Sequence, residues 1–182
     1  MKKVGFVSLG CPKNLVDSEV MMGTLEQAGW EITNNASEAD TVVVNTCGFI
    51  ESAKQESIDA ILEATGLKAE GKAKRVVVAG CLVERYRDDL MKELPEVDAF
   101  IGTNEVTRIL EAADETNKFR ELPLLPIGNK TATYLYDFDT PRHRATDSHT
   151  AFIKIAEGCD RPCAFCSIPS MRGSFRSRRF GS

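Results

Sequence analysis

The sequence has no long apolar run, and this absence argues against a membrane protein. No stretch approaches the roughly 18 consecutive apolar residues that a membrane-spanning helix needs. The apolar run at residues 4–9 is too short for the hydrophobic region of a secretory signal, and no small-residue cleavage site follows it. We therefore expect a cytoplasmic protein with no membrane among its partners.

Histidine is also scarce, and neither of the two histidines has a companion residue that would suggest a catalytic dyad. Apolar residues make up 42% and charged residues 27%, as is typical of a globular protein. The net charge of −4 hides a basic tail, since residues 151–182 hold six Lys/Arg against two acidic residues. Such a tail favours contact with RNA or an anionic cofactor, and a solvated loop explains it equally well.

Short apolar runs rich in β-branched residues alternate with helical patterns over about the first 115 residues. The expected strands are residues 3–9, 41–46, 74–80 and 98–102. The expected helices are residues 14–30, 52–66, 84–94 and 104–114. Strands that are apolar on both faces and alternate with helices predict an α/β fold, an open parallel sheet with helices on both faces.

The alternation stops after this region. The segment 118–148 contains three prolines and scattered polar residues, and we expect a linker with at most a short hairpin. The run TAFIKIAEG, at residues 150–158, predicts a strand that leads directly into a group of cysteines. We therefore predict an N-terminal domain at 1–117, a linker at 118–148 and the start of a second domain at 149–182.

The first three of the six cysteines share a position in the predicted fold. Cys11, Cys47 and Cys81 each follow an expected strand, and the carboxyl ends of parallel strands meet at one edge of a sheet. A single free cysteine often packs as a small apolar residue. Three thiols at equivalent strand ends, in a reducing compartment, instead favour a shared metal site with one open coordination position.

The other three cysteines, Cys159, Cys163 and Cys166, are spaced C-x3-C-x2-C. Zinc with His143 or His149 as the fourth ligand is one interpretation, but zinc loops usually close C-x2-C with a distant second pair. Ferredoxin-type clusters usually bring a fourth cysteine at local spacing, and none follows here. This group suits a [4Fe–4S] cluster whose unique iron binds another molecule.

With Phe165 directly before its third cysteine, this loop resembles the cluster loop of radical S-adenosylmethionine enzymes. The segments SLGCPKNLVDSE, VVNTCGFIESAKQESI, VAGCLVERY and DAFIGTNEV, followed by IPSMRGSFRSR, resemble the methylthiotransferases within that superfamily. GCPKN and NTCGFI resemble the branch that modifies the β-carbon of an aspartate in a small-subunit ribosomal protein. The tRNA-modifying branch more often reads GCQMN and NTCSIR at these places.

The resemblance implies two [4Fe–4S] clusters and S-adenosyl-L-methionine as cofactors. The implied ligands are Cys11, Cys47 and Cys81 for the first cluster and Cys159, Cys163 and Cys166 for the second. It further implies that the second cluster binds and cleaves S-adenosylmethionine, with Phe165 near the adenine, and that the first cluster holds the sulfur to be transferred. A ribosomal protein substrate, an external electron donor and a sulfur donor are the implied partners.

A complete enzyme of this family continues through a radical-enzyme barrel and a C-terminal RNA-binding-type β-domain. By this resemblance we expect a truncated chain that contains the N-terminal domain and the first strand and cluster loop of an incomplete barrel. Any RNA contact is then expected from the missing C-terminal domain. Two other functions stay open: the same chemistry on a tRNA adenosine, and a non-enzymatic iron–sulfur or zinc-binding module.

Overall fold

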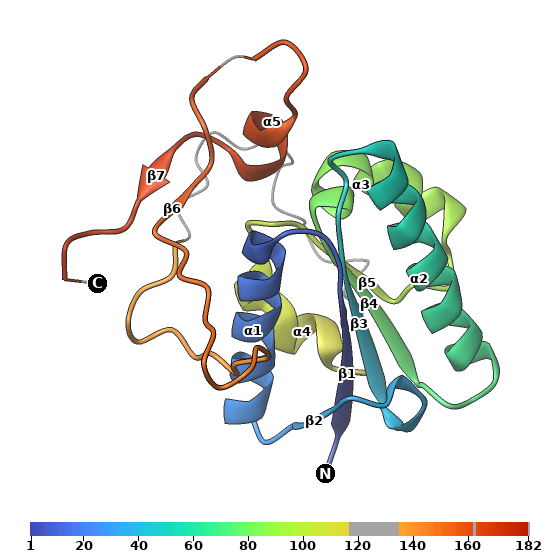
Figure 1. Cartoon of the computed structure of the whole chain (residues 1–182). Coiled ribbons are helices and arrows are strands. Elements are labelled where there is room, and N and C mark those ends of the chain that lie inside the picture. The colour runs from blue at the N-terminus through green and yellow to red at the C-terminus, as the bar shows by residue number, and fades with distance from the viewer. Residues whose placement is uncertain (117–134, 162, 182) are drawn as a thin grey trace.

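The computed structural model of the chain describes residues 1–116, 135–161 and 163–181. Five parallel strands form one sheet in the order β2-β1-β3-β4-β5 (Figure 1). Their bounds are β1 Lys3–Ser8, β2 Glu31–Thr33, β3 Thr41–Thr46, β4 Arg75–Gly80 and β5 Ala99–Ile101. Every residue of β3 and β4 is buried, as the apolar runs predicted.

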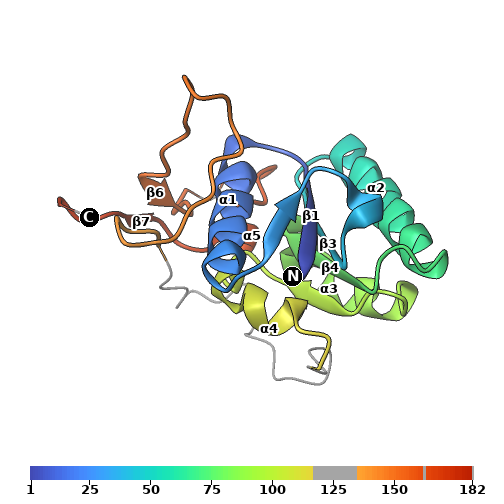
Figure 2. The ribbon, with the colours of Figure 1, turned by 90° about the horizontal axis from the view of Figure 1, so that it is seen from below.

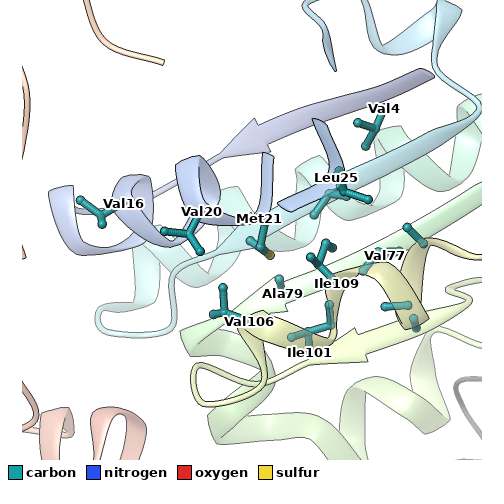
Figure 3. Packing of buried hydrophobic residues seen from close by; sticks show 14 of the residues in the cluster. Val4, Val16, Val20, Met21, Leu25, Val77, Ala79, Ile101, Val106 and Ile109 are labelled. Carbon is teal, nitrogen blue, oxygen red and sulfur yellow. The ribbon is translucent and has the colours of Figure 1, made fainter. Parts of the chain in front are cut away.

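Helices cover both faces of this sheet (Figure 2). The longer helices are α1 Pro12–Gln27, α2 Glu51–Ala69 and α3 Cys81–Glu93, and α4 Ile109–Ala113 is short. The chain also forms the 3-10 turns η1 Ala36–Glu38 and η2 Val106–Arg108. Val43 and Val77 of the central strands pack with α1 and α4 in one buried cluster (Figure 3). Their neighbours Val42 and Val76 pack with α2 and α3, because successive side chains of a strand point to opposite faces. The predicted α/β architecture is confirmed.

The edge strand β2 was not expected from the sequence. The helical pattern predicted a helix over 14–30, but α1 begins earlier, at Pro12, and ends at Gln27. Gly29 adopts φ +86° and turns the chain, so that Glu31–Thr33 pair with β1. Proline suits the first helical position because no N–H is needed there. In the described ranges no helix is long and apolar enough to cross a membrane.

The expected strand at 150–158 is correct only at its end. Two residues, β6 Ala156–Glu157, pair antiparallel with β7 Arg176–Ser177, and the preceding residues form no strand. Ile153 and Ile155 are 74% and 70% exposed, so these side chains lack a described layer to pack against. In the sequence, the short helix α5 Ile168–Arg172 follows β6 and precedes β7. It packs against α3 near the carboxyl edge of the five-stranded sheet (Figure 1).

The expected linker falls partly on residues 117–134, which lie outside the described residues. The described part, 135–148, forms no helix or strand, but it packs closely against α1. Glu19, fully buried, accepts hydrogen bonds from Arg142 Nε (2.7 Å) and the Ala145 backbone N–H (2.9 Å). Tyr136 joins the core beside α1. The boundaries at 117 and 148 stay predictions.

Candidate metal centre

The structure places Cys11, Cys47 and Cys81 at the carboxyl ends of three adjacent strands. Cys47 directly follows β3, Cys81 directly follows β4 and opens α3, and Cys11 is the N-cap residue of α1, three positions after β1. β1 and β4 both pair with β3, and both pairings are parallel. The three thiols therefore reach the same edge from segments that are far apart in the sequence.

Glycine allows two of these loops to approach each other. Gly10 has φ +90°, and a β-carbon there would lie 2.8 Å from Cys47 Cβ and 3.2 Å from Cys47 Sγ. Both the backbone conformation and the space at this position thus require glycine. The result is that the loop carrying Cys11 packs directly against Cys47.

Two buried asparagines hold the loops together. Asn14 Nδ2 donates to the carbonyl oxygens of Leu9 (3.1 Å) and Thr46 (2.8 Å), which joins the ends of β1 and β3. Asn45 Nδ2 donates in turn to the Asn14 carbonyl at 2.8 Å. Both side chains therefore bond across segments that are far apart in the sequence.

Cys81 is the most buried of the three thiols, at 6% exposure, whereas Cys11 is exposed. Its Sγ lies 3.5 Å from Asn14 Oδ1, which also accepts a hydrogen bond from Arg172 NH2. Burial raises the pKa of the Cys81 thiol to about 11, and the charge of Arg172 acts in the opposite direction. A metal ion would supply the further positive charge needed to hold this sulfur as a thiolate at neutral pH.

Arg172 belongs to a buried charge network of two cations and two anions. Its NH1 donates to Asp17 Oδ2 (2.6 Å) and Glu157 Oε1 (3.1 Å), and Lys154 Nζ lies 2.7 Å and 2.8 Å from the same two carboxylates. Tyr136 Oη also donates to Asp17. Burial alone would raise the pKa of Asp17, but Arg172 and Lys154 outweigh that effect and lower it. Asp17 is therefore ionised at neutral pH.

The sequence analysis did not bring the members of this network together. No spacing rule connects position 17 with positions 154 and 157, because the contacts form between α1 and the segment around β6. An acidic residue among the apolar positions of an expected helix was the one available signal.

The second triad lies in the loop between β6 and α5. Cys163 is exposed, while Cys159 and Cys166 are half-buried. Backbone bonds shape the loop: Cys159 N–H donates to the Gly173 carbonyl (3.1 Å) and Cys166 N–H to the Cys163 carbonyl (3.1 Å). A cavity of about 310 Å³ opens beside Cys159, with Asp160, Arg161 and Phe175 as its other lining residues.

Phe165 is 91% exposed in this loop and packs on no core cluster. Its expected place near an adenine stays a prediction. His143, considered as a zinc ligand, lies elsewhere: its Nδ1 is 3.2 Å from Glu26, near the C-terminal end of α1. Cys11 caps the opposite end of this 16-residue helix, which is roughly 24 Å long at 1.5 Å per residue.

Within the ranges that the structure describes, no three His, Cys, Asp or Glu side chains already stand close enough together to hold a single metal ion. The donor chemistry nevertheless fits an iron–sulfur cluster, which is larger than one ion and is held by thiolates. The first triad offers three thiols from three strand ends, and the second offers three thiols from one loop. Both sets leave the fourth position to another ligand.

Comparison with known proteins identifies the family of the chain. Residues 3–102 match the family described as "Uncharacterized protein family UPF0004". The chain is 57% identical over 180 residues to the ribosomal protein uS12 methylthiotransferase RimO of Solibacter usitatus, covering 99% of this chain and 37% of that protein. The proteins of the same name from Koribacter versatilis and Bdellovibrio bacteriovorus are 49% and 53% identical over 219 and 180 residues.

Those two alignments cover 100% and 97% of this chain, but 44% and 38% of the relatives. The chain thus spans about two fifths of the length of these curated relatives, and the matched portion includes both cysteine triads. It is similar to them from β1 to the end of the cluster loop. The chain therefore belongs to the UPF0004 family, the N-terminal domain of the radical S-adenosylmethionine methylthiotransferases.

Proposed function

We propose that this chain is the N-terminal part of an enzyme that methylthiolates the β-carbon of an aspartate in ribosomal protein uS12. The observation that carries this proposal is the arrangement of the thiols: Cys11, Cys47 and Cys81 lie at one sheet edge. The segment of the second triad is joined to that edge through Arg172, whose NH2 donates to Asn14 Oδ1. Identity to three uS12 methylthiotransferases over nearly the whole chain supports the substrate class.

The proposed ligands are the six cysteines, each triad holding one [4Fe–4S] cluster, with Phe165 beside the adenine of S-adenosylmethionine. When bound, these groups supply the electron that cleaves S-adenosylmethionine and the sulfur that is transferred. The chain's own residues bind and orient them. Asn14 and Asn45 fix the strand-end loops, and the glycine at position 10 lets backbone approach the first triad closely.

Lys13 of the GCPKN motif gives this segment a further structural role. Its Nζ donates to the Ala156 carbonyl at 2.9 Å and lies 3.5 Å from Glu157, so it ties the start of α1 to β6. In this motif Pro12 begins α1 and Lys13 links the helix to β6. Asn14 supports the loops of the first triad. An electron donor and a sulfur donor complete the proposed set of partners.

The test is an iron count after anaerobic reconstitution with iron and sulfide. We expect about eight irons per chain, falling to about four in the Cys159/Cys163/Cys166 triple alanine variant. The matched variant, Cys11/Cys47/Cys81 to alanine, should also retain about four. A total of four that falls to none in the first variant would leave the front cysteines as core residues and sink the two-cluster proposal. Zinc in place of iron would favour a structural module.

The substrate is tested separately, in cells that lack the gene encoding this chain. Mass spectrometry of uS12 should reveal loss of the methylthio group from an aspartate, with methylthio-adenosine in tRNA unchanged. The opposite pattern would assign the enzyme to tRNA.

A further inference from the structure

The loop of the second triad is held at both of its ends by one residue of α1. The segment before the loop contributes Lys154, and the helix after the loop contributes Arg172. Lys154 Nζ donates to Asp17 Oδ1 at 2.7 Å, and Arg172 NH1 donates to Asp17 Oδ2 at 2.6 Å. A single carboxylate therefore joins two segments of the chain that lie on either side of the second triad.

Glu157 completes this set of contacts. Its carboxylate lies 2.8 Å from Lys154 Nζ, and its Oε1 accepts a hydrogen bond from Arg172 NH1 at 3.1 Å. The two anions Asp17 and Glu157 balance the two cations, and each of the four side chains is at most 6% exposed. Removing one member would leave an uncompensated buried charge, so the geometry of the set is strongly favoured over alternatives.

Helix α5, which follows the loop, is also held from the side of α3 and β5. Thr103 Oγ1 donates to the Met171 carbonyl at 2.6 Å, and the Thr103 backbone N–H donates to Glu84 of α3 at 2.9 Å. The Met171 side chain is buried. A helix of five residues is not stable by itself, so contacts with the N-terminal domain decide where α5 lies.

The loop and the first triad are connected through α1. Cys11 is the N-cap residue of α1, and Asp17 follows it by six positions, which is less than two helical turns. On the side of the loop, α5 begins two residues after Cys166, and the Cys159 N–H donates to the carbonyl of Gly173, the residue after α5, at 3.1 Å. The same helix thus carries a proposed ligand of the first triad and the carboxylate that holds both ends of the second.

We propose that Asp17 is a positioning residue that fixes the loop of the second triad relative to the first triad. It does so by binding Lys154 and Arg172 at the same time, one on each carboxylate oxygen. This inference rests on the proposed function, in which one triad holds the sulfur and the other binds S-adenosylmethionine. Two reacting groups that are held by different parts of a chain need a fixed geometry between them.

The experiment compares Asp17→Asn with Glu19→Gln by hydrogen exchange and mass spectrometry of the metal-free full chain. Both residues are buried carboxylates of α1, but Glu19 holds Arg142 and the Ala145 N–H rather than the loop. Asp17→Asn should accelerate exchange of residues 151–160 and 168–178 roughly tenfold to hundredfold. Glu19→Gln should leave these rates unchanged and accelerate exchange at residues 141–145. Equal acceleration around the loop in both variants, or none in Asp17→Asn, would overturn the inference.

A distance measurement tests the relative position of the two triads directly. Cys11 and Ser170 of α5 are both exposed, so nitroxide labels are placed on Cys11 and on a Ser170→Cys variant whose other five cysteines are changed to alanine. Dipolar electron paramagnetic resonance should give a narrow distance distribution that broadens with Asp17→Asn and stays narrow with Glu19→Gln. A distribution that is broad already in the parent, or unchanged by Asp17→Asn, would contradict a position fixed by this carboxylate.

Lys154→Met keeps the inference testable if Asp17→Asn does not fold. This change removes the Lys154 bond, leaves Arg172 on Asp17 and keeps an apolar side chain of similar length. Exchange should then accelerate at residues 151–160 and stay unchanged at 168–173, and no acceleration at 151–160 would count against Asp17 as the anchor. Because all these measurements use metal-free protein, their failure is distinguishable from a failed iron count, which tests the proposed function.

Discussion

Gly23 and Gly66 are both helical glycines, but only Gly66 has room for a β-carbon. A β-carbon at Gly23 in α1 would lie 2.5 Å from Arg142 N and 2.7 Å from Arg142 Cα, which are backbone atoms that cannot rotate away. At Gly66 in α2, no atom of the described residues lies within 4 Å of such a β-carbon, apart from the backbone of the same helix. The pair therefore tests whether the segment around Arg142 really rests on α1.

The expected changes have opposite signs. Alanine at Gly66 should stabilise the protein by about 0.5–1 kcal/mol, because glycine is the poorer helix former. Alanine at Gly23 gains the same amount but forces the 141–145 segment off the helix. Overpacking costs roughly 1–3 kcal/mol, and the lost hydrogen bonds to the buried Glu19 carboxylate cost about 1.5–3 kcal/mol more. After the gain in helix propensity is subtracted, we expect a net loss of roughly 1.5–5.5 kcal/mol.

The measurement is thermal and urea unfolding of the wild type and both variants, followed by far-UV circular dichroism. For a chain of this size each kcal/mol shifts the melting temperature by about 2–4 °C, so Gly23→Ala should melt roughly 3–22 °C lower. A Gly23→Ala variant as stable as the wild type would show that the described part of the linker does not pack on α1. Equal losses in both variants would refute the steric argument.

Two further predictions concern the buried site. Asp17→Asn should cost roughly 3–5 kcal/mol of unfolding free energy at pH 7, because Lys154 and Arg172 would share one buried anion fewer. The folded-state pKa of Asp17 is lowered, so its contribution to stability is present above the unfolded pKa near 3.8 and is lost as pH falls through the lower folded value. The unfolding free energies of the wild type and Asp17→Asn, measured in urea, should therefore converge at that acidity. A constant difference between them down to acid pH would contradict the assignment. In the metal-free protein, iodoacetamide should alkylate the exposed Cys11 quickly and Cys81 slowly at pH 8, since Cys81 is buried and its pKa of about 11 leaves little thiolate. Peptide mass spectrometry over time gives both rates, and equal rates would refute this picture of Cys81.

The strands of the sheet were predictable because their signal is local. β3, β4 and β5 are apolar runs that the chain buries on both faces, and β1 is an apolar run that is buried in part. Such runs predict parallel strands. β2 lacked that signal, since Glu31–Thr33 is short and no residue in it is fully buried. The expected strand at 150–158 had the signal but not the neighbouring strands, and only two of its residues pair.

The sequence by itself determined where the six thiols sit, because the position of Cys11, Cys47 and Cys81 after apolar runs follows from parallel topology. The spacing of the second triad is a property of one loop. Only the tertiary structure decided how the two sets are joined, through the Arg172 hydrogen bond to Asn14 and the charge network around Asp17. Those contacts span more than 90 residues of chain, and they depend on burial in a common interior, which no local pattern of residues encodes.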